Sequence, residues 1–308
     1  MTRTFLGVPS AELHALPAGA DIVILSAREG TPYKPGQTSH AASAPDALRA
    51  ALARHEADTD RWDFDQDGPL LDPRVAIVDA GEIATSPATP ERNRQAIRAA
   101  AEAVLAQGAT PVLLGGDDSV PIPFFEAFAR SGPITILQID AHLDWLDQRG
   151  GLSHTFSSTM RRASELPFVE RIVQVGLRGI GGSRREELEA ARAFGSHLIT
   201  AAEIARDGVG VAIEHIPEGT RCLVTIDCDG LDPATMPSVI VPQPGGLSYL
   251  DMLALLDGVV ARATVVGCDL VELVPERDVG GLGTLTAARL VCKLVGAIGK
   301  QRLAAKAR

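Results

Sequence analysis

The sequence predicts an α/β fold built on a mostly parallel β-sheet with helices on both faces. Two observations predict it: short apolar runs rich in Val, Ile and Leu recur along the chain, and segments with helical periodicity separate them. Strands that alternate with helices are typical of a parallel sheet covered on both sides. With 45% hydrophobic and 22% charged residues, the chain has enough apolar material to bury such a core.

The predicted strands are the apolar runs themselves, whose shortness and β-branched composition are typical of buried strands. They comprise residues 21–25, 75–80, 111–116, 134–140, 172–179, 223–229 and 265–273.

Start signals mark several of the helices between the strands. Thr89 precedes a proline and is suited to be an N-cap. Ser183 with Glu186, and Ser248 with Asp251, have the spacing of capping boxes. We therefore expect helices to begin at these three places.

We expect residues 1–308 to form a single large domain, because no stretch has the length and composition of a linker. Gly and Pro cluster at residues 30–36 and 242–246, which predicts irregular loops. No apolar run approaches the ~20 residues of a membrane helix, and the first residues lack the pattern of an export signal. The four cysteines form no CxxC pair, which fits a reducing, cytoplasmic setting.

The formal net charge of −10 opposes attraction to nucleic acid or to an anionic membrane, so we expect neither as a partner. The same charge is compatible with a small cationic substrate. Solubility alone would also account for it.

Acidic residues follow the predicted strands. They are Asp117, Asp118, Asp140, Asp227, Asp229 and Glu272. The carboxyl ends of parallel strands line one crevice, which is where open α/β sheets bind ligands. So many carboxylates in one crevice would repel one another unless a cation neutralised them, and the pattern therefore predicts a metal site.

Two sequence motifs sharpen this prediction. In DAHLD, Asp140, His142 and Asp144 alternate with period two, so an extended backbone points all three side chains the same way, and Asp227 and Asp229 repeat the spacing. One such motif can arise by chance or at a solvated strand end; two at equivalent strand ends favour metal binding. Hard oxygen donors with one imidazole suit two divalent ions, manganese best and nickel, cobalt or iron as alternatives.

The remaining histidines carry weaker signals. Five of them have no motif around them and are expected to be surface or structural residues: His14, His40, His55, His197 and His215. His154 differs, because it lies just beyond DAHLD in a loop that could fold over the crevice.

With these motifs in order, the chain resembles the arginase and agmatinase family, the ureohydrolases, and its pattern is nearest to agmatinase-like members. The resemblance rests on GGDDS, DAHLD, SHTFSSTMRRA, VGLRG, TIDCDGLDP and DLVELVPERD, which together span residues 115–278. It implies a three-layer α/β/α fold of the arginase type and a dinuclear manganese site at which a metal-bridging hydroxide converts a guanidinium group to urea and an amine. It also implies an oligomer, as relatives form trimers or hexamers.

The resemblance further assigns roles to individual residues. Asp140 and Asp227 would bridge the two metals, and His142 and Asp229 would complete one metal site. The other site would hold Asp144 and the residue at position 118. Glu272 would orient the guanidinium through its carboxylate, and His154 would shuttle protons.

Three departures from the family pattern bear on function. Asp118 stands where GGDHS of the family has a histidine ligand, which changes the charge and reach at that metal site. MPSVIVPQPGG, residues 236–246, replaces the small-residue stretch that lies near the substrate in relatives. Trp145 and Leu146 replace the polar residues with which arginases hold the amino-acid end of arginine, so arginine is a poor substrate candidate. Trp145 is then either a core residue or a cavity wall that contacts a guanidinium by cation–π attraction.

These features favour a hydrolase of agmatine or another non-arginine guanidine, acting on the C–N bond. The alternative is a non-catalytic or weakly active homologue that serves as partner subunit in a hetero-oligomer, which the loss of the histidine ligand would explain. A different dinuclear hydrolase, such as a histone-deacetylase-like amide hydrolase, lacks the ordered series of GGD, DAHxD and DxDxxDP.

Overall fold

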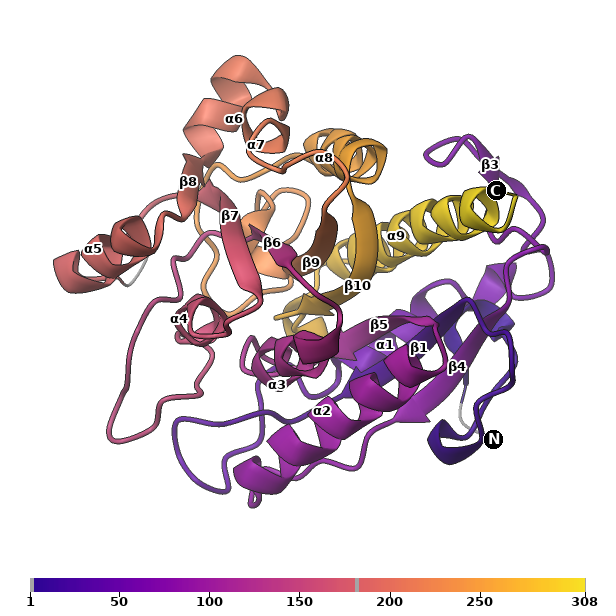
Figure 1. The fold of residues 1–308 in the computed structure, drawn as a ribbon, viewed down its shortest axis with the longest axis horizontal. Coiled ribbons are helices and arrows are strands. Elements are labelled where there is room, and N and C mark those ends of the chain that lie inside the picture. The colour runs from indigo at the N-terminus through magenta and orange to yellow at the C-terminus, as the bar shows by residue number, and fades with distance from the viewer. Residues whose placement is uncertain (1–2, 181–182, 308) are drawn as a thin grey trace.

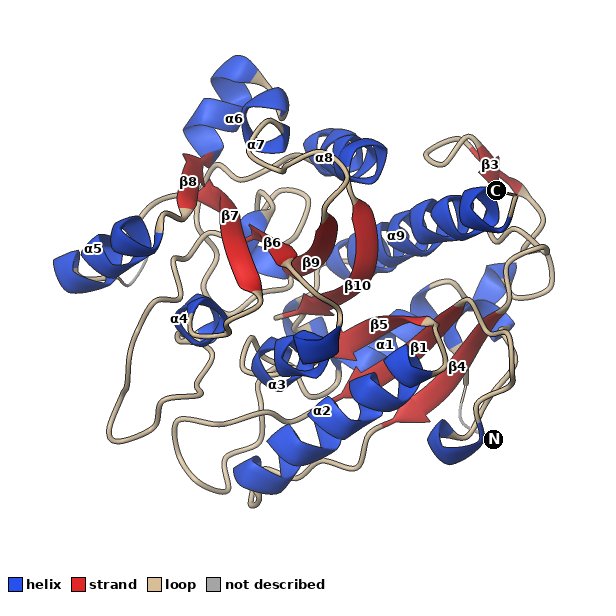
Figure 2. Ribbon diagram, in the orientation of Figure 1, coloured by secondary structure: helices blue, strands red, loops and turns tan. Residues whose placement is uncertain are grey.

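An eight-stranded parallel sheet forms the centre of the computed structural model, which describes residues 3–180 and 183–307 (Figure 1, Figure 2). The strand order is β4-β1-β5-β10-β9-β6-β7-β8, and each adjacent pair is parallel. The strands are β1 (Ile22–Ala27), β4 (Ile77–Glu82), β5 (Thr110–Gly115), β6 (Ile134–Ile139), β7 (Val169–Leu177), β8 (His197–Thr200), β9 (Arg221–Asp227) and β10 (Thr264–Val271). The predicted fold class is confirmed.

The sequence prediction missed the edge strand β8. It has only four residues, and just one of them, Ile199, is buried, so it lacks the continuous apolar run that marks the inner strands. A small antiparallel pair outside the main sheet, β2 (Trp62–Asp63) and β3 (Gly68–Pro69), was missed for the same reason.

Helices cover both faces of the sheet, so the molecule has three layers (Figure 2). In β1, Ile22 and Ile24 pack into the core on one face, and Val23 and Leu25 pack into the core on the other, as the period of two in a strand requires. The first face is covered by α1 (Ala44–Ala51), α6 (Ala201–Asp207), α7 (Gly210–Ile213), α8 (Tyr249–Arg262) and α9 (Leu282–Lys306). The second face is covered by α2 (Pro90–Ala106), α3 (Pro121–Glu126), α4 (Thr159–Ser164) and α5 (Arg185–Phe194). Short 3₁₀ turns connect the layers at Phe5–Gly7, Leu13–Ala15, Ala53–His55, Ala127–Arg130, Cys228–Gly230 and Pro275–Arg277.

Two of the three predicted helix starts are confirmed. α2 begins directly after Thr89. The capping box before α8 is present, since the Ser248 hydroxyl accepts from the backbone N–H of Asp251 and the Asp251 carboxylate accepts from that of Ser248. The third prediction is wrong by one residue, because the N-cap of α5 is Arg184, whose backbone N–H donates to Glu187.

Helix α9 is the one described helix that is long and apolar enough to cross a membrane by length and composition. However, 72% of its most apolar stretch is buried inside the fold. Its apolar residues pack against α1, α8 and the sheet, as in the core helix of a globular protein.

Candidate functional site

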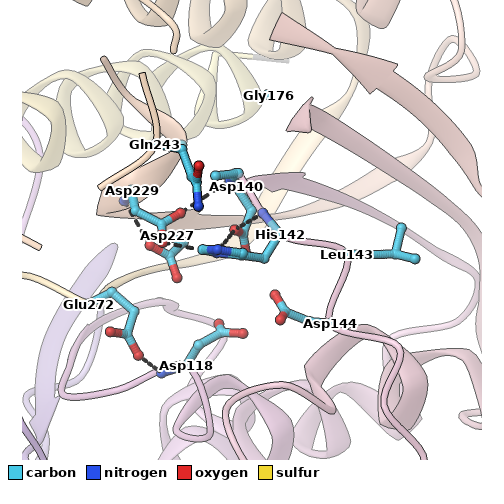
Figure 3. Close-up of polar contacts among 12 residues, drawn as sticks. Asp118, Asp140, His142, Leu143, Asp144, Gly176, Asp227, Asp229, Gln243 and Glu272 are labelled. Atoms are coloured by element: carbon cyan, nitrogen blue, oxygen red, sulfur yellow. Dashed lines mark hydrogen bonds and ion pairs between the residues drawn. The ribbon is translucent and has the colours of Figure 1, made fainter. Parts of the chain in front are cut away.

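The predicted acidic residues meet at the carboxyl ends of four adjacent strands, β5, β10, β9 and β6 (Figure 3). β10 and β9 lie between β5 and β6, so two strands that are consecutive in the sequence are separated in the sheet. Such a change in strand order opens a crevice at the carboxyl edge. The side chains that lie there are Asp118, Asp140, His142, Asp144, Asp227 and Asp229, which we call the acidic cluster, together with Glu272.

Two overlapping sets of ligand atoms within this cluster are close enough to hold metal ions. One set comprises Asp140, His142 and Asp229, and the other comprises Asp118, Asp140 and Asp144; within each set the ligand atoms lie within 4.8 Å of one another. Asp140 belongs to both sets and is fully buried at the end of β6. A carboxylate shared in this way has the two oxygens needed to contact two neighbouring cations.

Hydrogen bonds within the cluster order its carboxylates. Nδ1 of His142 lies 3.0 Å from Oδ2 of Asp229 and 3.5 Å from Oδ1 of Asp140. The backbone N–H of Asp229 donates to Oδ1 of Asp227 at 2.8 Å, and that of His142 donates to Oδ1 of Asp140 at 2.6 Å. Asp227 is therefore connected to His142 through Asp229, which contacts both residues.

The electrostatics of the cluster are those of an anionic site that requires a counter-cation. Burial, followed by the repulsion of neighbouring carboxylates, raises the pKa of Asp118, Asp140 and Asp227 well above the usual range of aspartate. For His142, burial lowers the pKa, but the hydrogen bond to Asp229 and the surrounding negative charge outweigh this and raise it to about 9. A bound cation would allow the carboxylates to ionise and the imidazole to lose its proton.

Asp118 has a free oxygen directed at the cluster. Its Oδ2 atom is buried and accepts no hydrogen bond from the described residues. The backbone on both sides is held, since the Asp118 N–H donates to Oε1 of Glu272 at 2.9 Å and the hydroxyl of Thr159 donates to the Asp118 carbonyl. A buried carboxylate oxygen without a donor is unusual and suits a cation ligand.

Glu272 is held at both carboxylate oxygens. Oε1 accepts from Asp118, and Oε2 lies 2.5 Å from Nε2 of His40. The sequence analysis did not predict this contact, in which His40 meets a site residue that lies 232 positions further along the chain. No motif surrounds His40, so no local signal in the sequence could have revealed this contact.

Two site residues have an unusual backbone conformation. Asp144 has a φ angle of 52° and Glu272 one of 63°, a region that residues other than glycine rarely adopt. Such strain persists where the surrounding structure holds the residue in place, and it is frequent in functional sites. The backbone of Glu272 is held by a hydrogen bond, since its N–H donates to the carbonyl oxygen of Gly116 at 2.9 Å.

A polar relay behind the cluster was not predicted. Nε2 of Gln138 donates to Asp140 at 2.7 Å and to Asp144 at 3.1 Å. Gln138 precedes Asp140 by two positions in β6, so the same period-two argument that aligned DAHLD could have found it. Trp145 is a core residue with 2% exposure and donates to Gln174 behind Gln138. The alternative prediction, a Trp145 ring lining the cavity, is wrong.

Arg178, at the end of β7 in the VGLRG motif, holds the segment that carries Asp229. Its Nη2 donates to the carbonyl oxygens of Asp229 at 2.7 Å, Leu231 at 3.0 Å and Gln243 at 3.0 Å. Two of these residues, Asp229 and Gln243, are labelled in Figure 3. The planar, forked guanidinium thus joins the turn at residues 227–231 to the 236–246 loop by hydrogen bonds to both.

Four residues of the acidic cluster, His142, Asp144, Asp227 and Asp229, line a cavity of about 620 Å³. Its wall combines apolar, polar and charged side chains. The lining residues are His142, Asp144, Leu146, Gln148, Arg149, Gly150, Phe156, Ser157, Ile180, Ser183, Arg184, Glu187, Asp227, Asp229, Ile240, Val241 and Glu272. The 236–246 loop reaches the cavity through Ile240 and Val241, while Ser238 and Val239 are buried elsewhere.

His154 does not belong to the described residues that line this cavity. Its ring lies beside Ser153 and is half-buried, and its pKa is lowered by burial and then by the charges of Arg94 and Arg162. The loop that carries it nevertheless reaches the cavity wall at Phe156 and Ser157. A role for His154 in proton transfer stays a prediction.

Comparison with known proteins identifies the family of the chain and agrees with its fold. Residues 20–296 match the model of the arginase family. The N(1)-aminopropylagmatine ureohydrolase of Thermus thermophilus is 37% identical over 214 residues, which are 68% of this chain and 70% of that protein. The proclavaminate amidinohydrolase of Streptomyces clavuligerus is 30% identical over 288 residues, covering 91% and 88%. The solved structure of that enzyme matches with a TM-score of 0.79 and 26% identity, covering 97% of this chain and 98% of the other. The chain belongs to the arginase family.

Proposed function

We propose that this arginase-family protein hydrolyses a guanidino compound other than arginine to urea and an amine. The observation that carries the proposal is the pair of overlapping ligand sets that share the buried Asp140. Members of both sets line the cavity together with Glu272, since His142 and Asp229 of one set and Asp144 of the other are lining residues. The names of the relatives agree with this chemistry, since ureohydrolases and amidinohydrolases act on guanidino or amidino groups.

The residues fit two divalent metal ions. Asp118 offers a buried oxygen that accepts no hydrogen bond from the described residues, and the raised pKa values of Asp118 and Asp140 support a bound positive charge at the cluster. Asp140, His142, Asp227 and Asp229 would hold one ion. Asp118, Asp140, Asp144 and Asp227 would hold the other. Hard oxygen donors with one imidazole favour manganese, with nickel as the second choice. Such ions, when bound, lower the pKa of water enough to supply a nucleophile near neutral pH.

The protein's own groups bind and orient the substrate. The Glu272 carboxylate can accept two N–H donors of a guanidinium in a forked arrangement. Asp144, fixed by Gln138, lies on the cavity floor, where it can accept a proton from the attacking water. In the overall reaction a C–O bond forms at the guanidinium carbon, one C–N bond breaks, and the leaving amine takes up a proton. His154 is proposed to deliver that proton through the 153–158 loop.

The side chains at the mouth of the cavity would contact the part of the substrate beyond its guanidinium group, which we call the tail. Leu146, Ile240 and Val241 provide apolar contacts, which suits a methylene chain. Arg149 and Arg184 are cationic and exposed, and Glu187 adds one carboxylate. Among the residues that the structure describes, this mouth has no dense acidic patch for a second cation, so guanidino compounds with anionic or neutral tails belong beside agmatine among the candidates.

A second candidate function remains because Asp118 replaces the histidine of the family pattern. In that case the chain would be a weakly active or non-catalytic partner subunit in a hetero-oligomer. A homo-oligomer and a cytoplasmic location are proposed with the main function. Light scattering of the purified protein gives the assembly size.

The test is to purify the chain alone, load it with Mn²⁺ or Ni²⁺, measure bound metal, and assay urea release. The substrate panel contains guanidine, agmatine, 4-guanidinobutyrate and arginine, and Asp140→Asn is the inactive control. We expect two metals per chain and urea from at least one substrate other than arginine. Two bound metals without urea from any substrate would reject the catalytic proposal, and activity that appears only with a homologous subunit would establish the partner role.

A further inference from the structure

His40 contacts one oxygen of the Glu272 carboxylate. Glu272 lines the cavity, whereas His40 is not among the described residues that do. Nε2 of His40 is 2.5 Å from Oε2 of Glu272, and the His40 side chain is 24% exposed against 7% for Glu272. The contact therefore fixes one carboxylate oxygen of a residue that lines the cavity.

The contact leaves Glu272 able to bind a substrate. Each carboxylate oxygen has two lone pairs. The Asp118 N–H occupies one lone pair of Oε1, and His40 occupies one of Oε2. One lone pair on each oxygen remains for a forked pair of N–H donors, which is the number that a guanidinium presents to a carboxylate.

His40 is itself fixed by the cavity wall. Its ring packs edge-on against Phe156, with ring centroids 5.5 Å apart, and Phe156 packs against Tyr33 at 4.2 Å. The Tyr33 hydroxyl is 2.6 Å from that of Ser157, and the Arg149 guanidinium lies 4.5 Å above the Tyr33 ring. The 30–40 loop and the 153–158 loop are thus fastened together, and His40 connects them to Glu272.

We infer that His40 is a positioning residue, which holds the Glu272 carboxylate in the plane that receives the guanidinium of the substrate. The inference rests on the proposed function. A glutamate side chain has several rotatable bonds, and a carboxylate anchored at one oxygen alone can rotate away from the productive orientation. Small misplacements of a substrate-orienting group lower rates strongly, so the second anchor matters for catalysis.

The test compares two substitutions of similar size. His40→Gln keeps an N–H donor that can reach Glu272, and His40→Leu removes it. With the best guanidine of the panel, His40→Leu should lower kcat/KM at least 30-fold, mainly through KM, because the Glu272 contact forms when substrate binds. His40→Gln should stay within fivefold of the unmodified protein. Both variants should bind the same number of metal ions, and His14→Leu, at an exposed histidine, is the matched control.

A double-mutant cycle shows whether His40 acts through Glu272. In a Glu272→Gln background, His40→Leu should change kcat/KM less than threefold, since the group it positions is already altered. Equal losses in both backgrounds, or equal losses in His40→Leu and His40→Gln, would overturn the inference while leaving the proposed function intact. If the unmodified protein binds two metals and releases no urea, the proposed function fails and the inference fails with it.

Discussion

The indole N–H of Trp145 donates to Oε1 of Gln174 at 2.7 Å, which connects the hydrophobic core to the acidic cluster. Gln174 donates to Gln138 at 2.6 Å, and Gln138 donates to Asp140 and Asp144. All five side chains are buried. Partners of this kind orient the residues that hold a metal, and they affect metal affinity although they do not touch the ion.

Gln138→Leu should weaken Mn²⁺ binding by about 10- to 100-fold, the usual effect of losing such a partner. The substitution removes the donor that fixes the carboxylates of Asp140 and Asp144. Calorimetric titration of the metal-free protein measures the change. Trp145→Phe, two steps further along the relay, should have a smaller effect in the same direction. An unchanged Kd in Gln138→Leu would show that the relay has no part in metal binding.

Asp118→Asn should reduce the metal content from two ions per chain to one, because the amide loses the charge of the orphan oxygen. Asp118→His should keep two ions but change the preference between Mn²⁺ and Ni²⁺, since imidazole is a softer ligand than carboxylate. Metal analysis after dialysis measures both outcomes, with the exposed Asp147→Asn as control. If Asp118→His matches the unmodified protein in affinity and preference, Asp118 is not a ligand.

The metal-free protein should lose stability as pH rises from about 4, the unfolded pKa of aspartate, to about 8, the folded pKa of Asp269. Burial raises the pKa of Asp269 to about 8, and burial with mutual repulsion raises those of Asp140 and Asp227. A folded pKa above the unfolded value of about 4 means that the protonated carboxyl favours the fold, and this contribution disappears as pH passes through the folded pKa. Thermal unfolding in a chelator measures the trend.

Asp140→Asn gives the matched control for this pH dependence. Without metal it should unfold at a higher temperature than the unmodified protein at pH 8, because one buried negative charge is gone. With Mn²⁺ the order should reverse, since binding to the folded state stabilises only the protein that retains the ligand. An unmodified protein whose unfolding temperature does not respond to Mn²⁺ would contradict the metal site.

Arg178→Lys should destabilise the fold by about 2–4 kcal/mol, because an ammonium cannot make the several hydrogen bonds to backbone carbonyls that the guanidinium makes. The affected segment carries Asp229, so metal affinity should fall as well. Chemical denaturation and metal titration measure the two effects. A stability loss without any change in metal binding would show that Arg178 supports the fold alone.

Arg184→Ala should distinguish between substrate tails. Arg184 is an exposed cation at the cavity mouth, and exposed ion pairs contribute up to about 1 kcal/mol. The substitution should therefore lower kcat/KM for 4-guanidinobutyrate by up to about fivefold and leave or raise that for agmatine. The ratio of the two rates is the measurement. The same ratio in both proteins would place the substrate tail away from Arg184.

The sequence by itself determined the sheet and the positions of the acidic residues on it. Alternating apolar runs and helical segments require a covered parallel sheet, and a carboxylate placed directly after a strand must lie at its carboxyl edge. Asp140 and Glu272 directly follow β6 and β10, and Asp227 is the last residue of β9, so local periodicity was enough to predict their convergence. The edge strand β8 was not predicted, because its four residues are short of a continuous buried run and show little hydrophobic periodicity.

Only the tertiary structure decided which side chains support the acidic residues. His40 meets Glu272 across 232 positions, Gln174 on β7 meets Gln138 on β6, and Arg178 reaches Asp229 across 51. Each contact depends on which strands and loops are neighbours, a property of the whole sheet order rather than of any local stretch. The same order brings Phe156 and Ser157 into the cavity wall and leaves His154 beside Ser153. Local periodicity sets the face and end of a strand on which a residue lies, and long-range packing sets what stands opposite it.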